Sequence, residues 1–148
     1  MSTIVLRGST TSMLEDVERA IDDGVCTIKT LTRDPRLVAG AGALEIHMAK
    51  IITDYSKTQP GLDQYAIEAF GQALEAIPRI IAENAGLKGE TIIADLYSKT
   101  GDSNKFGIDV SDGKVKDVDA IGIYDCWETK SWAMKLCCDA VLTILKVD

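Results

Sequence analysis

The stretch Glu18–Glu45 constrains the fold more than any other part of the chain. Its first part carries apolar residues at spacings of three and four, which predict an amphipathic helix that ends at Asp34–Pro35. The small residues Gly40–Gly42 then predict a loop, and a second helical pattern follows them. Two adjacent carboxylates, Asp22–Asp23, lie on the first helix. A carboxylate near a loop that exposes backbone N–H groups at a helix start suits the binding of phosphate and water.

The rest of the chain predicts further helices. The first helix is expected to begin at Ser12, with Glu15 completing a capping box. A turn is predicted at Thr58–Gly61, and a third helix from Leu62 should break at Pro78, which has no N–H group to donate. The remaining predicted helices are a short one that ends near Gly86, another over Thr91–Tyr97, and a last one from Trp127. The core face of the first helix is expected to hold Leu14, Val17, Ile21, Val25, Ile28 and Leu31, and that of the last helix Trp132, Leu136, Ala140, Ile144 and Leu145.

Short β segments complete the predicted fold, which is mainly α. Thr3–Arg7 is expected to be a strand with no obvious partner, which hints at the fringe of a second domain. Phe106–Val110 and Lys114–Val118 flank Ser-Asp-Gly and predict a β-hairpin. The polar stretch Lys99–Lys105 and the stretch Ile121–Asp125 are expected to be loops.

Composition excludes several classes of function. The chain has 148 residues and a net charge of −7, which suits one domain with or without a piece of another and argues against nucleic-acid binding. No apolar run approaches the roughly 18 residues of a membrane span, so no membrane association is expected. Four cysteines without a CxxC spacing, and one histidine, argue against a zinc site. The expectation is reduced, mostly buried thiols in a cytosolic protein.

Six ordered strings of sequence resemble the group II chaperonins, the eukaryotic cytosolic ring chaperonins of the T-complex polypeptide family. They are TIVLRG, ERAIDDG, LVAGAGALE, AIEAFGQALEAIPRIIAENAG, GIDV and the final helix with ILKVD. Together these strings cover nearly the whole chain in the family's order. Two further segments, Thr32–Val38 and Pro60–Phe70, are most similar to one particular paralogous subunit.

The resemblance implies a place for the chain within a larger subunit. Residues 1–31 would be the C-terminal part of the intermediate domain, and residues 32–148 the helical C-terminal half of the equatorial ATP-binding domain. The phosphate loop and the magnesium-binding aspartate of the family would lie in the N-terminal half, so no metal ligand is expected among these residues. Such a fragment is expected to be inactive alone, although the intact subunit resembles an ATPase.

The resemblance also implies an activity, cofactors and partners. The intact protein would be a cytoplasmic, ATP- and Mg²⁺-dependent ring chaperonin that assists protein folding. Its partners would be other chaperonin subunits in a double ring, and unfolded clients such as cytoskeletal proteins.

Asp23 matches the family's catalytic aspartate, which orients or deprotonates the water that attacks the γ-phosphate. Without the resemblance, adjacent aspartates on a helix are more simply a solvated face. Asp22 is expected to be a surface residue, because neighbours on a helix point about 100° apart.

Gly40, Ala41 and Gly42 match a glycine loop that lies against the nucleotide in the family. Taken alone, the same residues are more simply a structural turn. Ala41 replaces a usual glycine, so its methyl group is tolerated at negative φ, whereas a positive φ would strain or shift the loop.

Three more residues match the nucleoside end of the family's site. Gly107 and Asp109 match a segment near the adenine, and Asp125 matches the residue that binds the ribose hydroxyls. Asp109 suits hairpin stabilisation equally well, and Asp125 also suits an N-cap of the last helix.

A different class of function stays open from the residues alone. The chain could be a self-standing acidic helical interaction or assembly module without nucleotide chemistry.

Overall fold

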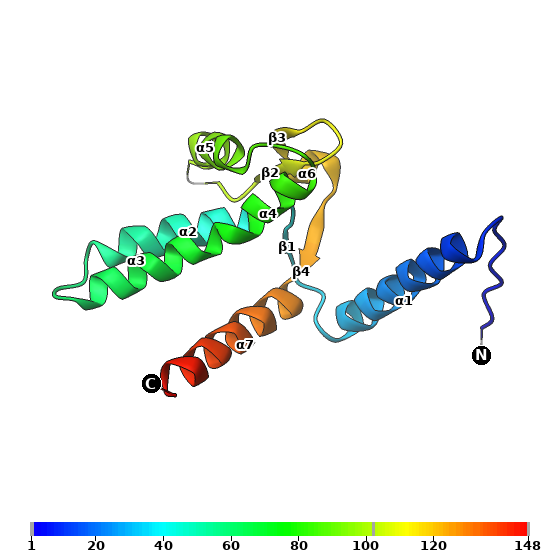
Figure 1. Cartoon of the computed structure of the whole chain (residues 1–148), viewed down its shortest axis with the longest axis horizontal. Helices are drawn as coiled ribbons and strands as arrows, with labels where there is room; N and C mark the ends of the chain where they lie inside the picture. The colour runs from blue at the N-terminus through cyan, green and yellow to red at the C-terminus, as the bar shows by residue number, and fades with distance from the viewer. Residues whose placement is uncertain (1, 102, 148) are drawn as a thin grey trace. The chain divides into compact units, whose positions relative to one another are not determined.

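A computed structural model describes residues 2–101 and 103–147 (Figure 1). The helices are α1 (Thr11–Arg33), α2 (Ala43–Ser56), α3 (Asp63–Leu74), α4 (Ala76–Asn84), α5 (Gly89–Thr100), α6 (Val118–Ile121) and α7 (Trp127–Leu145). The strands are β1 (Leu37–Ala39), β2 (Phe106–Asp109), β3 (Lys114–Asp117) and β4 (Tyr124–Cys126). The predicted mainly α fold with a few short strands is therefore confirmed.

The chain divides into two compact units, one of residues 38–125 and one of residues 1–37 with 126–148. Each is described here by itself. The outer ends of the predicted domains, Met1 and Asp148, lie outside the described residues.

The unit of residues 38–125 has the main hydrophobic core. Helix α2 packs along α3, and α5 packs on α4 and on the hairpin of β2 and β3. Seven buried residues from these elements form one cluster: Ile46, Ala82, Ile92, Ile93, Leu96, Ile108 and Val115. On α3, Leu74 is buried, whereas Tyr65 is 63% exposed.

The predicted break at Pro78 is confirmed. Helix α3 ends at Leu74, whose carbonyl would accept the hydrogen bond that Pro78 cannot donate, and α4 restarts at Ala76. Pro78 thus lies in the first turn of α4, where backbone N–H groups have no partner within the helix. Helix α4 then ends at Asn84, close to the predicted Gly86.

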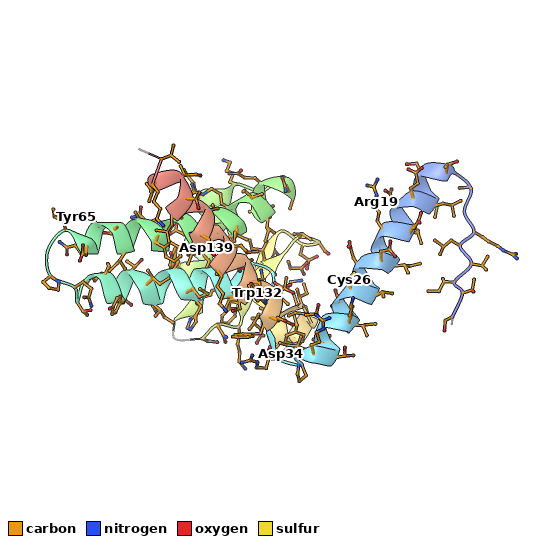
Figure 2. All side chains as sticks on the ribbon, turned by 90° about the horizontal axis from the view of Figure 1, so that it is seen from below. Arg19, Cys26, Asp34, Tyr65, Trp132 and Asp139 are labelled. Atoms are coloured by element: carbon orange, nitrogen blue, oxygen red, sulfur yellow. The ribbon has the colours of Figure 1, made fainter. Side chains whose placement is uncertain are left out.

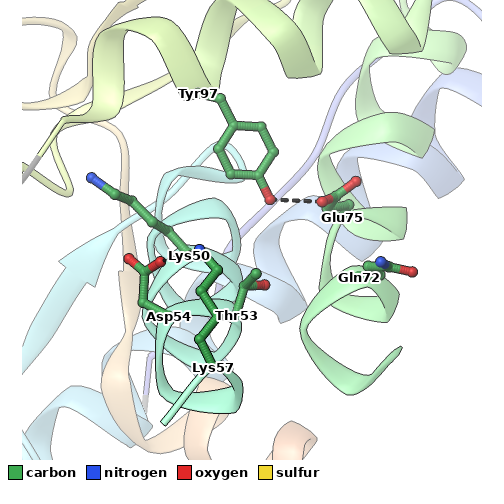
Figure 3. Close-up of a pocket in the computed structure, with 7 residues that line it drawn as sticks. All are labelled: Lys50, Thr53, Asp54, Lys57, Gln72, Glu75 and Tyr97. Atoms are coloured by element: carbon green, nitrogen blue, oxygen red, sulfur yellow. Dashed lines mark hydrogen bonds and ion pairs between the residues drawn. The ribbon is translucent and has the colours of Figure 1, made fainter. Parts of the chain in front are cut away.

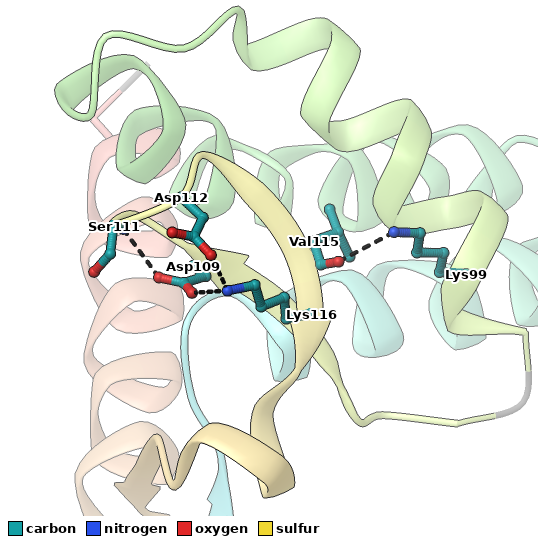
Figure 4. Close-up of polar contacts among 6 residues, drawn as sticks. All are labelled: Lys99, Asp109, Ser111, Asp112, Val115 and Lys116. Atoms are coloured by element: carbon teal, nitrogen blue, oxygen red, sulfur yellow. Dashed lines mark hydrogen bonds and ion pairs between the residues drawn. The ribbon is translucent and has the colours of Figure 1, made fainter.

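The predicted hairpin is also confirmed. Strands β2 and β3 are antiparallel, with Phe106 opposite Asp117 and Asp109 opposite Lys114. The ammonium group of Lys99 donates to the carbonyl oxygen of Val115 at 3.1 Å, which ties α5 to β3 (Figure 4). Lys99 belongs to α5, so the predicted polar loop begins later than expected.

A second two-stranded sheet, of β1 and β4, was not expected from the sequence. Residues 121–125 were predicted to form a loop, but they contribute to α6 and β4. Strands of three residues are too short for an alternating pattern to identify them.

Two predictions for the unit of residues 1–37 and 126–148 are wrong. Thr3–Arg7 is not a strand, because no described segment pairs with it and an unpaired strand leaves its backbone groups unsatisfied. Helix α1 begins one residue earlier than predicted, and its N-cap is Thr10, whose hydroxyl accepts from the N–H of Met13 at 3.3 Å. With methionine at this third position, no capping box forms.

The expected core faces of α1 and α7 do not form a core among the described residues. Neither helix has a buried residue, and Ile28 and Leu136 are both more than 60% exposed. The amphipathic pattern is present, but no described residue covers the apolar face.

The cysteines are also more exposed than predicted. All four are free, but Cys26 (Figure 2) and Cys137 are exposed and only Cys126 is buried, so the expectation of mostly buried thiols is wrong. No described helix combines the length and the apolar character that crossing a membrane needs.

Candidate functional site

The loop Gly40–Gly42 joins β1 to the start of α2. The N–H of Gly40 donates to the carbonyl oxygen of Ile123 at 3.1 Å, and the N–H of Ala43 donates back to the carbonyl of Gly40. Ala41 has φ 55°, the only positive value found for a non-glycine residue in the described chain, and Gly42 has φ 79°. The methyl group of Ala41 is therefore held in the left-handed region, which costs roughly 1–2 kcal/mol for an L-residue. Of the two cases considered from the sequence, a tolerated negative φ and a strained positive φ at Ala41, the structure shows the positive one.

Gly107 lies directly against this loop. A Cβ atom placed on Gly107 would lie 3.0 Å from both the Cβ and the carbonyl oxygen of Ala41. The next residue, Ile108, donates its N–H to that same carbonyl at 3.0 Å. The first strand of the hairpin thus approaches the loop closely, and any side chain at position 107 would force the loop or the strand to shift.

Asp125 lies on the other side of the loop. A Cβ atom on Gly40 would lie 3.4 Å from the carboxylate carbon of Asp125. The alternative role of Asp125 as helix N-cap is wrong, because the N-cap of α7 is Cys126 and no side chain bonds it. The carboxylate of Asp125 therefore lies beside the loop and does not cap α7.

Asp109 takes part in an ion-pair cluster at the end of the hairpin (Figure 4). Its carboxylate accepts from Nζ of Lys116 at 2.7 Å and from the N–H of Ser111 at 2.9 Å, and Lys116 also pairs with Asp112. The hydrogen bond from Lys116 lowers the pKa of Asp109 below its usual value. These contacts stabilise the hairpin, which was one of the two alternatives for this residue.

Asp23 is exposed on α1 and belongs to the other unit. Its carbonyl oxygen accepts from the hydroxyl of Thr27 at 2.9 Å, and its neighbour Asp22 is also exposed. Of the predicted site residues, the structure therefore brings together five around one loop: Gly40, Ala41, Gly42, Gly107 and Asp125.

Two residues at this loop were not singled out from the sequence. Pro78 closes one side, since a Cβ on Gly42 would lie 2.7 Å from the Cβ of Pro78. Glu45 is fully buried in the first turn of α2, where a carboxylate is favoured by the helix dipole. A charged residue between two apolar neighbours, Leu44 and Ile46, was the available signal for Glu45. No group of three or more His, Cys, Asp or Glu side chains that could hold a metal ion occurs in residues 2–101 and 103–147.

A separate groove lies between α2, α3 and α5, and no residue of the loop lines it (Figure 3). Its volume is about 270 Å³, and its lining includes Lys50, Lys57 and Glu75. The hydroxyl of Tyr97 donates to Glu75 Oε1 at 2.6 Å, and Lys57 pairs with Asp54 at 2.9 Å. Tyr97, Glu75, Lys57 and Asp54 thus bond to one another in pairs, and Lys50 donates to the carbonyl oxygen of Gly101, so these polar groups are already engaged within the chain and the groove does not resemble a prepared ligand site.

Comparison with known proteins identifies the family. The TCP-1/cpn60 chaperonin family model matches residues 1–148. The chain belongs to the TCP-1/cpn60 chaperonin family. It is similar to T-complex protein 1 subunit theta of chicken (Gallus gallus, 51% identity), human (Homo sapiens, 52%) and Arabidopsis thaliana (47%), in each case over the whole chain. The predicted resemblance to group II chaperonins, and to this paralogue in particular, is confirmed.

The chain spans 28% of the length of its chicken and human relatives and 27% of the Arabidopsis one. A solved structure, the open-state monomer of a group II chaperonin from Methanococcoides burtonii, superposes with a TM-score of 0.78 and 28% identity. The alignment covers 95% of this chain and 35% of that one. This chaperonin membership favours the interpretation of the chain as part of a chaperonin subunit over that of a self-standing interaction module.

Proposed function

We propose that the chain forms part of an ATP-dependent ring chaperonin subunit, and that its loop Gly40–Gly42 binds ATP. The proposal rests most on one observation, the close approach of Gly107 to Ala41, which would be lost with any larger side chain at position 107. Residues 1–31 would belong to the intermediate domain and residues 32–148 to the equatorial domain. The family's phosphate loop and metal ligand would come from a part of the subunit outside these residues.

The residues at the loop suit a nucleotide in their chemistry. Small residues at Gly40 and Gly42 let the backbone approach a phosphate closely, and the N-terminus of α2, a helix of 14 residues, favours an anion there. Asp125 offers a carboxylate acceptor for the two hydroxyl donors of a ribose. Asp109 already accepts from Lys116 and Ser111, so its proposed contact with the adenine end requires those bonds to be shared or exchanged.

Asp23 would act on the attacking water. A carboxylate can hold this water in line with the leaving oxygen and accept a proton from it. Bound ATP would supply the γ-phosphoryl group, and Mg²⁺ would neutralise the charge that develops on it. The exposure of Asp23 on a helix of the other unit fits a base that acts only when the domains close.

The partners and location follow from the same proposal. Other chaperonin subunits would surround this one in a double ring, and unfolded polypeptides such as cytoskeletal proteins would be the clients, in the cytoplasm. The apolar residues exposed on α1 and α7, Ile28 and Leu136 among them, are consistent with surfaces that are covered in a larger assembly.

The experiment uses a chimaeric subunit, in which this chain replaces the matching region of a full-length theta relative. ATP binding is measured by calorimetry for the chimaera and for its Gly107→Val variant. We expect the chimaera to bind ATP and the variant to lose at least tenfold in affinity. Absence of ATP binding by a folded chimaera, or unchanged affinity in the variant, would overturn the proposal.

A further inference from the structure

The segment between α1 and β1 is fixed by an unusual set of contacts around Arg36. The guanidinium group of Arg36 binds the carboxylate of Asp34 through Nε at 2.9 Å and through Nη2 at 2.5 Å. The same group lies 3.6 Å from the centroid of the Trp127 ring. The N–H of Trp127 donates to the carbonyl oxygen of Arg36 at 3.0 Å. We refer to Asp34, Arg36 and Trp127 as the Arg36 clamp.

The local sequence makes this clamp rigid. Pro35 fixes its own φ and forces the residue before it out of the helical region, and Asp34 is indeed extended, with φ −136° and ψ 106°. The N–H of Arg36 donates back to Asp34 Oδ1 at 3.1 Å. Backbone and side chain are therefore both held, which is more than an isolated surface ion pair achieves.

The position of the clamp in the chain gives it a functional consequence. The chain runs from Asp23 on α1, through Asp34–Arg36, into β1 and then into the loop Gly40–Gly42. Any change in the direction of α1 must therefore be absorbed in this segment or at its ends. Anchoring of Arg36 to the first residue of α7 restricts that change.

From this geometry we propose that Arg36 is a positioning residue for ATP hydrolysis, which acts by fixing the segment that links the helix of Asp23 to the loop Gly40–Gly42. This inference rests on the proposed function. Arg36 would touch neither the nucleotide nor the water. Its loss should leave ATP affinity intact and slow the chemical step, because a misplacement of about 1 Å can cost up to a hundredfold in rate.

Arginine and Trp127 are specifically required by the contacts. Lysine keeps the charge, but it loses the planar group that binds a carboxylate through two nitrogens and stacks on a ring. Tyrosine at position 127 keeps an aromatic face, whereas leucine keeps only apolar volume. If only the positive charge of Arg36 mattered, Arg36→Lys would behave like the parent and Trp127→Leu would behave like Trp127→Tyr.

The test measures kcat and ATP affinity in the chimaeric subunit. We expect Arg36→Lys and Trp127→Leu each to lower kcat about tenfold or more with little change in ATP affinity, and Trp127→Tyr to stay near the parent. The double variant Arg36→Lys/Trp127→Leu should be no slower than the slower single variant. Arg33→Lys, the same change three residues earlier at an exposed site in the last turn of α1, is the matched control and should leave kcat unchanged.

The outcomes separate this inference from the proposed function. If Asp23→Ala abolishes turnover but Arg36→Lys leaves kcat unchanged, the positioning role is wrong and the proposed function stands. Loss of ATP affinity in Arg36→Lys, or additive effects in the double variant, would also overturn the positioning role. If Asp23→Ala leaves turnover intact, the proposed function itself fails. Circular dichroism of each variant shows whether it is folded. If Arg36→Lys fails to fold, it is replaced by Arg36→Gln.

Discussion

The backbone N–H of Ile108 donates a hydrogen bond of 3.0 Å to the carbonyl oxygen of Ala41. This bond joins the hairpin to a loop more than sixty residues earlier in the sequence, and the loop carbonyl faces the hairpin. Because Ala41 has a positive φ, its carbonyl can face the hairpin while the chain turns into α2. The loop geometry thus depends on a contact that is distant in sequence.

Gly107→Ala should destabilise the chain. The added methyl would lie 3.0 Å from the Ala41 carbonyl oxygen and 3.1 Å from that of Gly40, and neither backbone atom can move easily. We expect a loss of about 1–3 kcal/mol in the free energy of unfolding, measured by urea denaturation. Gly24→Ala is the matched control, because a methyl there meets nothing within 4 Å. In a helix interior this control should stabilise by about 0.5–1 kcal/mol, and equal losses in both variants would contradict the close contact.

Ala41→Gly should have the opposite effect on stability. The substitution removes the left-handed strain of roughly 1–2 kcal/mol but increases the freedom of the unfolded chain by about 0.5–1 kcal/mol, so a net gain of about 0.5 kcal/mol is expected. The loop keeps its conformation, and ATP affinity of the chimaeric subunit should therefore be preserved or improved. Thermal unfolding and an ATP titration measure the two effects. A clear loss of affinity would contradict the assignment of this loop to the nucleotide.

The sequence predicted elements whose signals are local. The break before Pro78 follows from a missing donor, and the hairpin follows from a short turn between two β-prone runs. The paired strands β1 and β4 were missed because each has only three residues and depends on a partner more than eighty residues away. The N-cap at Thr10 was missed for a simpler reason, since Ser12 with Glu15 offered a competing local pattern.

The candidate site was predicted only in part for the same reasons. The glycines at positions 40, 42 and 107 were identified by resemblance, but the sign of φ at Ala41 could not be derived from neighbouring residues, and the loop contacts Ile108, which is distant in sequence. Pro78 was expected to break a helix, and its second role beside Gly42 depends on how α4 packs. The exposed faces of α1 and α7 show the limit of periodicity, which predicts an apolar face but not the element that covers it.

The Tyr97–Glu75 hydrogen bond should stabilise the packing of α5 against the junction of α3 and α4. Burial and the bond to Glu75 both raise the pKa of Tyr97, so this phenol remains a neutral hydrogen-bond donor beyond the pH at which a free tyrosine ionises. Tyr97→Phe should cost about 1–3 kcal/mol, since a charge-assisted bond is lost and Glu75 is left without this donor. Tyr65→Phe, at a side chain that is 63% exposed, is the control and should change stability by less than about 0.5 kcal/mol. If the two variants behave alike in urea denaturation, the bond does not contribute to stability.

The hairpin cluster should make stability depend on acid pH. In the folded chain the pKa of Asp109 is lower than its ordinary value, because Lys116 and Ser111 bond to the carboxylate. The unfolded chain then binds the proton more tightly, so this contribution is present above about pH 4 and is lost as the pH falls through the folded pKa. Denaturation midpoints at pH 6 and pH 3 should differ less in Asp109→Asn than in the parent. Asp95→Asn, at an exposed carboxylate on α5, should retain the parental difference, and an equal reduction in both variants would exclude the cluster as its source.

Single-turnover ATP hydrolysis by Asp23→Ala in the chimaeric subunit tests the central claim most directly. Asp22→Ala is the matched control, because this adjacent carboxylate points about 100° away on the same helix. Asp23→Ala should retain ATP binding and lose at least about a hundredfold in hydrolysis rate, as expected for a general base, while Asp22→Ala stays near the parent. Intact hydrolysis in Asp23→Ala, or equal losses in both variants, would contradict the assignment of Asp23 and with it the proposed role of this chain.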